Sequence, residues 1–174
     1  MKLKILTISL AIIAQMLFVS QVDAQSVSKK KADKQTEVYR YEIACAGTGV
    51  QGTYLVKVWT YSKKPSVAFE QSKKNAVHGI IFKGFAGNSI AGCTSQKPIA
   101  TNPTIEQEQS DFFRKFFSDG GNYMKYVNTS EPLGTDVVKV GKEYKVGVVV
   151  SVAKDQLRKD LEAAGMIKGL SSGF

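Results

Sequence analysis

The sequence has few of the residues that most often carry chemistry: one histidine and two cysteines in 174 residues. A zinc site needs about four ligands, and neither a second histidine nor an H-E-x-x-H pair is present to supply them. There is no G-x-S-x-G motif, and Cys45 lies in no recognisable protease or transpeptidase context. We therefore expect no metal centre, no bound cofactor and no enzyme. A hydrolase or thiol enzyme using Cys45 or His78 stays as the second alternative.

Long apolar runs are also scarce, because Ile5–Val19 is the only one. Lys2 and Lys4 precede this run, and small residues follow it up to Ala24. The pattern predicts a secretory signal peptide over residues 1–24. A signal anchor is the weaker interpretation, since the run is short for a membrane span and a polar segment follows it. No cysteine stands at the cleavage point, as a lipoprotein would require. We expect an exported protein, periplasmic or extracellular, with no transmembrane segment after signal cleavage.

Removal of the signal leaves about 150 residues, the size of one domain. The hydrophobic share of 43% and the charged share of 22% are ordinary for a globular protein, so neither wholesale disorder nor a fibrous repeat is indicated. Residues 25–37 are polar and basic, and they predict a disordered linker. Residues 38–174 then form the single predicted domain.

The net charge is +9, and it falls to +8 when residues 1–24 leave. Such an excess favours anionic surfaces. Part of it belongs to the linker, however, and the other lysines are scattered along the chain, which is typical of a solvated surface. Nucleic acid is not an expected partner of an exported protein. An anionic glycan or lipid is one alternative partner.

The two cysteines, Cys45 and Cys93, belong to a chain predicted to enter a compartment where disulfides persist. Cys45 ends a predicted strand and Cys93 lies in a predicted loop, so a bridge would anchor that loop to the sheet. Closing this loop would contribute on the order of 3 to 4 kcal/mol in the chain-entropy model. The competing interpretations are a buried small hydrophobe at Cys45 and a free thiol at Cys93.

Residues Val38–Ala46 and Thr53–Tyr61 alternate between apolar and polar side chains, which predicts an antiparallel hairpin. The turn between them contains G-x-G-x-x-G, from Gly47 to Gly52. A dinucleotide site needs a helix after the third glycine, whereas a β-branched and aromatic segment follows here. The motif therefore predicts a hairpin turn with positive-φ glycines.

A helix is predicted to begin at Pro65 and to end at Gly79. Ile80–Phe82 would then form a strand parallel to the one before the helix. His78 falls on the polar side of this helix, in its last turn, so we expect it to face solvent. A general acid or base is the sharper hypothesis for this residue.

Residues 84–104 are rich in Gly, Asn, Ser, Pro and Thr and predict a long loop, and long ordered loops are often functional. We place a candidate contact surface on this loop, formed by Gly84, Phe85, Asn88, Ile90, Lys97 and Pro98. A helix should follow from a capping box at Thr104 to about Ser118. Its aromatic stripe predicts core packing, with a docking surface as the alternative: Ile105, Phe112, Phe113, Phe116 and Phe117.

The last third of the chain predicts a short strand at Tyr123–Val127, a hairpin of Val137–Val140 with Tyr144–Val152, and a final helix at Asp155–Ala164. The second hairpin arm should be a central strand covered on both sides. The fold class is therefore α+β, with a mixed sheet of about five or six strands, a strand-helix-strand unit and about two to three helices.

Two segments, YEIACAGTGVQGTYLVKVW and KKNAVHGIIFKGF, resemble uncharacterised secreted envelope proteins of Gram-negative anaerobes. A weaker resemblance links the Ala68 and Asn75-Ala76-Val77 helix and the strand EYKVGVVV to small envelope lipoproteins and to the N-terminal domain of flagellar assembly protein T. The chain departs from the lipoproteins by lacking their lipid-attachment cysteine. What the resemblance implies is a non-enzymatic accessory role in envelope assembly, with a periplasmic binding or scaffolding module and an envelope protein as its partner.

Overall fold

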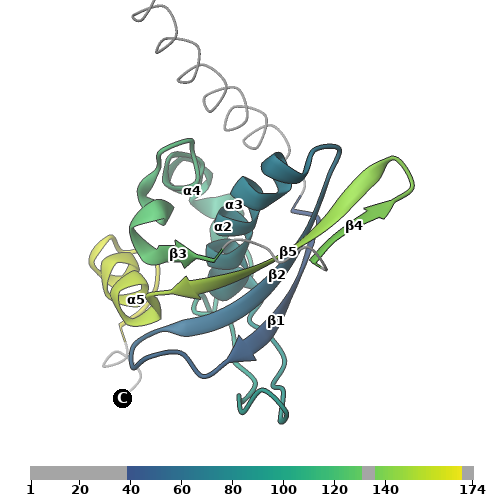
Figure 1. The fold of residues 1–174 in the computed structure, drawn as a ribbon. Coiled ribbons are helices and arrows are strands. Elements are labelled where there is room, and N and C mark those ends of the chain that lie inside the picture. The colour runs from purple at the N-terminus through teal and green to yellow at the C-terminus, as the bar shows by residue number, and fades with distance from the viewer. Residues whose placement is uncertain (1–38, 131–135, 170–174) are drawn as a thin grey trace, which may run out of the picture.

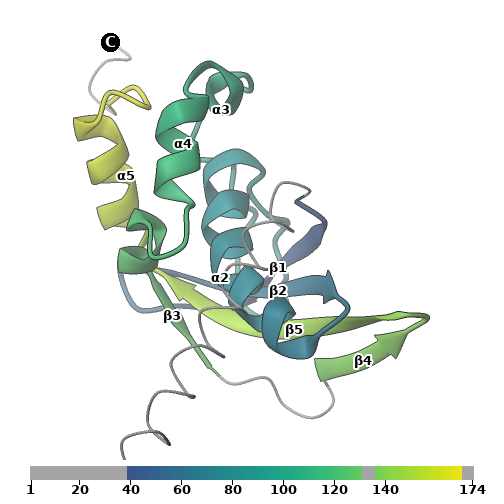
Figure 2. The same cartoon turned by 90° about the horizontal axis from the view of Figure 1, so that it is seen from above.

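The computed structural model describes residues 39–130 and 136–169. The predicted signal peptide over 1–24 and the linker over 25–37 lie outside the described residues. One five-stranded sheet carries its helices on one face (Figures 1 and 2). This arrangement confirms the predicted α+β class and the single compact domain.

The strands are β1 (Tyr41–Gly47), β2 (Tyr54–Ser62), β3 (Val127–Thr129), β4 (Val137–Val140) and β5 (Glu143–Val152). Their order is β1-β2-β5-β3, and β4 also pairs with β5. Every pairing is antiparallel. Both predicted hairpins are therefore confirmed, whereas the predicted parallel strand is not formed.

That strand is missing because helix α2 runs from Pro65 through Phe82 and includes Ile80–Phe82. Gly79 does not end the helix. A Cβ at this position would lie 2.8 Å from the Ile43 side chain, so the glycine permits close approach of α2 to β1. The helix ends instead before Gly84, whose φ of +69° is the left-handed geometry of a helix C-cap.

The remaining helices are α3 (Ile105–Glu108), α4 (Ser110–Phe116), a 3-10 helix (Asn122–Tyr126) and α5 (Lys154–Ala163). The predicted helix from Thr104 to Ser118 is thus two helices, broken at Gln109. The Thr104 hydroxyl bonds Glu108 and Asn102 rather than the helix backbone, so the predicted capping box does not form. The predicted strand at Tyr123–Val127 is mostly the 3-10 helix, and pairing begins only at Val127.

The core lies between the helices and one face of β2 and β5. The valines on this face are fully buried: Val56, Val58, Val146, Val148, Val150 and Val152. Phe113, Phe116 and Phe117 belong to the same buried cluster and contact aromatic rings of α2 and the 3-10 helix, with Phe112 and Ile105 packed at the edge. The aromatic stripe is therefore core, as predicted.

In the described part of the chain, no helix covers the opposite face of the sheet (Figure 2). The prediction that β5 is central within the sheet is confirmed, but the prediction that both of its faces are covered is wrong. We call the uncovered surface the open face, and its charged and aromatic residues are Arg40, Glu42, Lys57, Trp59, Tyr61, Glu143 and Lys145. Its cations are paired, in Arg40–Glu143, Lys57–Asp136 and Lys145–Glu42 ion pairs.

Candidate functional site

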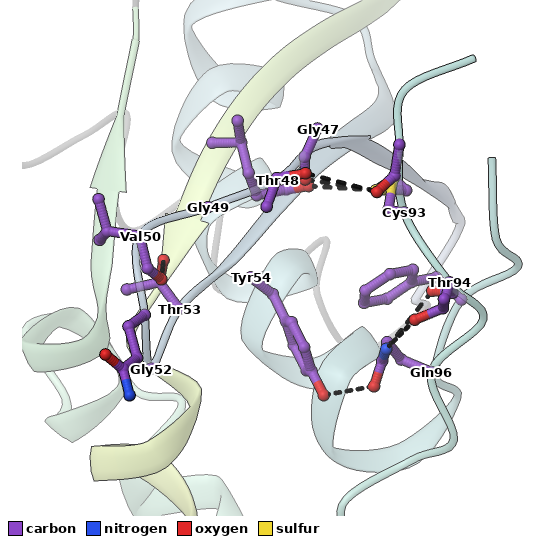
Figure 3. A pocket seen from close by; sticks show the side chains of 15 residues that line it. Gly47, Thr48, Gly49, Val50, Gly52, Thr53, Tyr54, Cys93, Thr94 and Gln96 are labelled. Carbon is purple, nitrogen blue, oxygen red and sulfur yellow. Dashed lines mark hydrogen bonds between the residues drawn. A yellow bond between two sulfur atoms is a disulfide. The ribbon is translucent and has the colours of Figure 1, made fainter. Parts of the chain in front are cut away.

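Two stretches of the sequence without any charged residue meet at one end of the molecule. One is the 14-residue run Ile43–Val56 and the other is the 13-residue run Gly84–Gln96. Side chains from the β1–β2 turn face side chains of the second run across a cleft (Figure 3). We call these two runs together the charge-free end.

The β1–β2 turn is held by its own hydrogen bonds. The Thr53 amide and hydroxyl both donate to the Val50 carbonyl, at 3.0 and 2.7 Å. Gly52 has a φ of +81°, and its carbonyl accepts the Asp155 amide at the start of α5. The predicted hairpin turn with a positive-φ glycine is confirmed, and a strand rather than a helix follows it.

The second run is an ordered arm rather than a structureless loop. Phe85 and Gln96 exchange two backbone hydrogen bonds, and so do Asn88 and Cys93, all at 2.9–3.0 Å. At the tip, the Asn88 side-chain oxygen accepts the amides of Ile90 and Ala91. The arm therefore has the pairing of a short hairpin with a capped turn.

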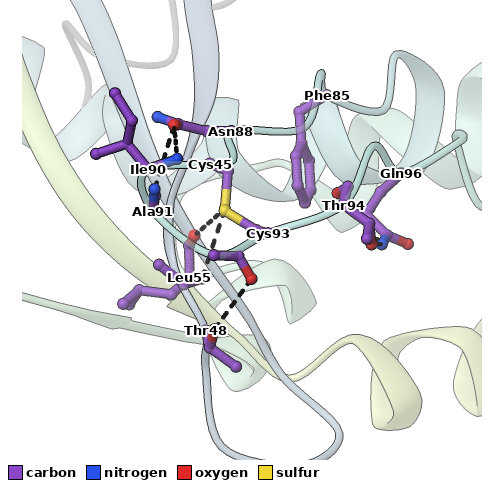
Figure 4. Close-up of a disulfide and its surroundings, with 12 residues drawn as sticks. Cys45, Thr48, Leu55, Phe85, Asn88, Ile90, Ala91, Cys93, Thr94 and Gln96 are labelled. Atoms are coloured by element: carbon purple, nitrogen blue, oxygen red, sulfur yellow. Dashed lines mark hydrogen bonds between the residues drawn. A yellow bond between two sulfur atoms is a disulfide. The ribbon is translucent and has the colours of Figure 1, made fainter.

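A disulfide between Cys45 and Cys93 joins the arm to the end of β1, with 6.5 Å between the two Cα atoms (Figure 4). The predicted bridge is confirmed, so neither of the competing interpretations of these cysteines holds. Two further contacts cross the cleft. The Thr48 hydroxyl donates to the Gly92 carbonyl at 3.4 Å, and the Tyr54 hydroxyl donates to Gln96 at 2.6 Å. The disulfide is compatible with an oxidising, exported location.

The cleft has a volume of about 260 Å³. None of its described lining residues is charged: Cys45, Gly47, Thr48, Gly49, Val50, Gln51, Gly52, Thr53, Tyr54, Leu55, Phe85, Gly92, Cys93, Thr94 and Gln96. The Tyr54 ring packs edge-on against Phe85, with 5.3 Å between ring centres. Hydroxyl, amide and aliphatic groups line the space, so it suits an uncharged group of a partner.

The contact residues predicted from the sequence differ in how exposed they are in the structure. Gly84 and Phe85 are buried, so they shape the arm from within and offer little surface. Asn88 is exposed, but its side-chain oxygen already caps the tip. Lys97 is exposed and Pro98 is half-buried. Ile90 is 99% exposed.

Sequence reasoning located the arm but missed the β1–β2 turn as the opposite wall of the cleft. The signal was present in the sequence, since both runs lack charge and each contains one cysteine. Pairing the cysteines brings the two runs together, and their shared composition then defines one surface.

His78 lies away from the cleft, and the prediction that it faces solvent is wrong, since it is only 3% exposed. Its Nδ1 accepts the Tyr41 hydroxyl at 2.7 Å, and its Nε2 donates to Glu106 at 3.0 Å. The Tyr39 ring stacks on it at 3.4 Å. Burial lowers the pKa of His78, although Glu106 opposes this effect. The imidazole joins β1, α2 and α3, and both ring nitrogens are engaged.

Gln71, Lys74 and Asn75 lie on the same side of α2 that was predicted to be polar, and they are buried as well. The sheet packs on one side of the helix, and the 3-10 helix packs on another. Asn75 donates to the buried Thr60 hydroxyl, which also accepts from Ser72. Burial lowers the pKa of Lys74, whose ammonium lies over the Tyr123 ring. These groups therefore belong to the packing of α2 and not to an accessible site.

Two features are absent among the described residues. No group of three or more His, Cys, Asp or Glu residues could hold a metal ion there. No helix among these residues has the length and apolar character needed to cross a bilayer. Comparison with known proteins gave no match among family models, curated proteins or solved structures.

Proposed function

We propose that this protein is a non-enzymatic, exported accessory of the cell envelope that binds another envelope protein through the charge-free end. The observation that carries the proposal is a preformed cleft without charge in a protein whose net charge is +9. The signal-peptide pattern and the disulfide support export.

A protein partner fits this surface because the buried centre of a protein interface is depleted in charged residues. The walls of the cleft are built by backbone hydrogen bonds and a disulfide, so binding would cost little ordering of the chain. These features support a site that is largely formed before its partner arrives.

The alternatives receive less support. An anionic glycan or lipid calls for a cluster of accessible cations. Neither run of the charge-free end contains a cation, the cations of the open face are held in ion pairs, and exposed lysines such as Lys63, Lys97 and Lys159 lie on separate parts of the chain. A thiol enzyme calls for a free thiolate, and Cys45 is bonded to Cys93. A histidine-dependent hydrolase calls for a base in reach of substrate, and His78 is buried.

The test is site-specific photo-crosslinking in intact cells. A photoreactive residue replaces Gln51, which is exposed at the cleft, and in a control chain it replaces Lys159, which is exposed on α5. We expect one discrete protein adduct from position 51 and none from position 159.

A matched pair of second substitutions then tests whether the cleft is responsible. Thr48→Arg brings a charge into the cleft and should abolish the adduct, whereas Thr101→Arg, at an exposed position outside it, should leave the adduct intact. Recovery of nothing but bulk polysaccharide, or an adduct that persists in Thr48→Arg, would overturn the proposal.

A further inference from the structure

We infer that Ile90 and Val50 are the anchors of this interface, and that the partner is a protein surface with apolar pockets that accept two aliphatic side chains. This inference rests on the proposed function. It adds the chemistry of recognition, namely insertion of aliphatic groups without ion pairing.

Exposure singles out these two residues. Among the described residues, five large hydrophobic side chains are exposed, and the two most exposed are Ile90 at 99% and Val50 at 74%. Both belong to the charge-free end: Val50 begins the β1–β2 turn, and Ile90 lies at the tip of the arm (Figures 3 and 4). Single exposed aliphatic residues are ordinary on a protein surface, but these two belong to the two uncharged runs that the disulfide joins. Val50 lines the cleft, and Ile90 lies on the arm outside that lining.

Both turns hold their aliphatic residue in a fixed backbone. The Ile90 amide donates to the Asn88 side chain at 3.0 Å, and the Gly92 amide closes the turn on the Ser89 carbonyl at 3.1 Å. The Val50 carbonyl accepts two hydrogen bonds from Thr53. An aliphatic group held this way loses little freedom on binding, which is the property that makes a preorganised contact residue effective.

The absence of charge within both runs favours a protein over a membrane as the occupant. Attraction of a protein to anionic lipid depends on lysine or arginine beside the inserting residues. None lies within either run. Lys57, Lys83 and Lys97 stand just beyond the ends of the runs, and Lys154, which lies over the Tyr54 ring, is paired with Asp155. A partner protein with apolar pockets needs no such cations, and its binding should depend little on salt.

The experiment measures binding between this protein, purified without reductant, and the partner identified by crosslinking from position 51. We expect Ile90→Ser to weaken binding at least tenfold and Val50→Ser to weaken it several-fold. Ile90→Leu should stay within twofold of the parent, and so should Val138→Ser, a control at a 46% exposed valine of β4. Raising NaCl from 50 to 500 mM should change the dissociation constant less than twofold. Unchanged melting temperatures would show that the variants are folded.

The outcomes separate this inference from the proposed function. If Thr48→Arg abolishes binding while Ile90→Ser and Val50→Ser bind like the parent, the inference fails and the proposed function stands. If position 51 captures no protein, the proposed function itself fails. Sedimentation with vesicles of phosphatidylethanolamine and phosphatidylglycerol that Ile90→Ser abolishes would assign the anchors to lipid and overturn the inference. An adduct between two copies of this chain would also overturn it.

Discussion

The open face and the charge-free end are both solvent-facing, but they differ in the contacts that hold them. Ion pairs between side chains hold the first, and backbone hydrogen bonds hold the second. On the open face, three cations meet three carboxylates at 2.6 to 2.8 Å, and the ammonium groups of Lys57 and Lys145 lie over the Trp59 ring. At the charge-free end, backbone bonds hold two turns that present aliphatic groups to water. The charges of the first surface are paired with one another, and its exposed valines, Val138 and Val140, lie on the β4 edge. The second surface presents its more exposed aliphatic groups on runs without charge.

Strand register explains why the charged and aromatic side chains of the open face contact one another. Trp59 lies between Glu42 of β1 and Gly147 of β5, and Tyr61 lies opposite Lys145. Side chains directly opposite one another on neighbouring strands interact. The ion pairs Arg40–Glu143 and Glu42–Lys145 then reach across β2, over the row of aromatic rings that lies between their charges. The two runs of the charge-free end are not paired as neighbouring strands. A disulfide and two side-chain hydrogen bonds join them instead.

The largest expected effect comes from removing the disulfide, which joins residues 48 apart in sequence. The double substitution Cys45→Ser with Cys93→Ser should lower the free energy of unfolding by about 3 to 4 kcal/mol, because the unfolded chain gains freedom. It should also separate the walls of the cleft and abolish partner capture, while the open face keeps its structure.

Urea unfolding followed by Trp59 fluorescence measures this change, since Trp59 is the only tryptophan. The native emission spectrum should match that of the parent, because Trp59 belongs to the open face. Reductant should destabilise the parent and leave the double variant unaffected. A parent protein whose stability does not respond to reductant would contradict the prediction.

The next effect is on the open face. A Cβ at Gly147 would lie 2.8 Å from the Trp59 ring and 2.9 Å from the Lys57 side chain, so Gly147→Val must displace both. We expect a loss of about 1 to 3 kcal/mol in unfolding free energy and a shifted Trp59 emission, as overpacking predicts.

Ser151→Val is the matched control, on the same strand and face but opposite Leu55. It should change stability by less than about 0.5 kcal/mol. Partner binding should survive in both variants. Loss of binding in Gly147→Val with an intact fold would mean that the open face, and not the charge-free end, contacts the partner.

The smallest effect is that of one surface ion pair. Glu42→Gln removes the carboxylate that bonds Lys145 and Tyr61, and these bonds lower the pKa of Glu42 below its ordinary value of 4.5. Because Glu42 is exposed, the cost at neutral pH should stay below about 1 kcal/mol and should shrink in 1 M NaCl.

The pH dependence of this pair has a defined sign. The folded state holds the carboxylate more strongly than the unfolded state does, so its contribution is present above pH 4.5 and is lost as pH falls through the lowered pKa. The stability difference between parent and Glu42→Gln should therefore vanish in acid. A difference that grows on acidification would contradict this assignment.

Several elements were predictable because their signals are local. Alternation over Thr53–Tyr61 and Tyr144–Val152 reports burial of one face of each strand, and both strands are present. The spacing of Phe113, Phe116 and Phe117 likewise reports one buried helix face. The errors concern residues whose state depends on distant neighbours. A glycine at position 79 is compatible with the end of a helix and also with close packing of β1 against a continuing helix. Only the position of the Ile43 side chain shows that the second alternative holds.

Sequence alone determined the α+β class, the two hairpins, the pair of cysteines and the existence of two runs without charge. Tertiary structure alone decided that those runs face each other across a cleft, that His78 is buried between Tyr41 and Glu106, and that one face of the sheet stays open. The physical reason is that periodicity records how each segment is buried but not which segment buries it. The partner of each surface is set by strand pairing, by the disulfide and by the direction in which each helix lies on the sheet.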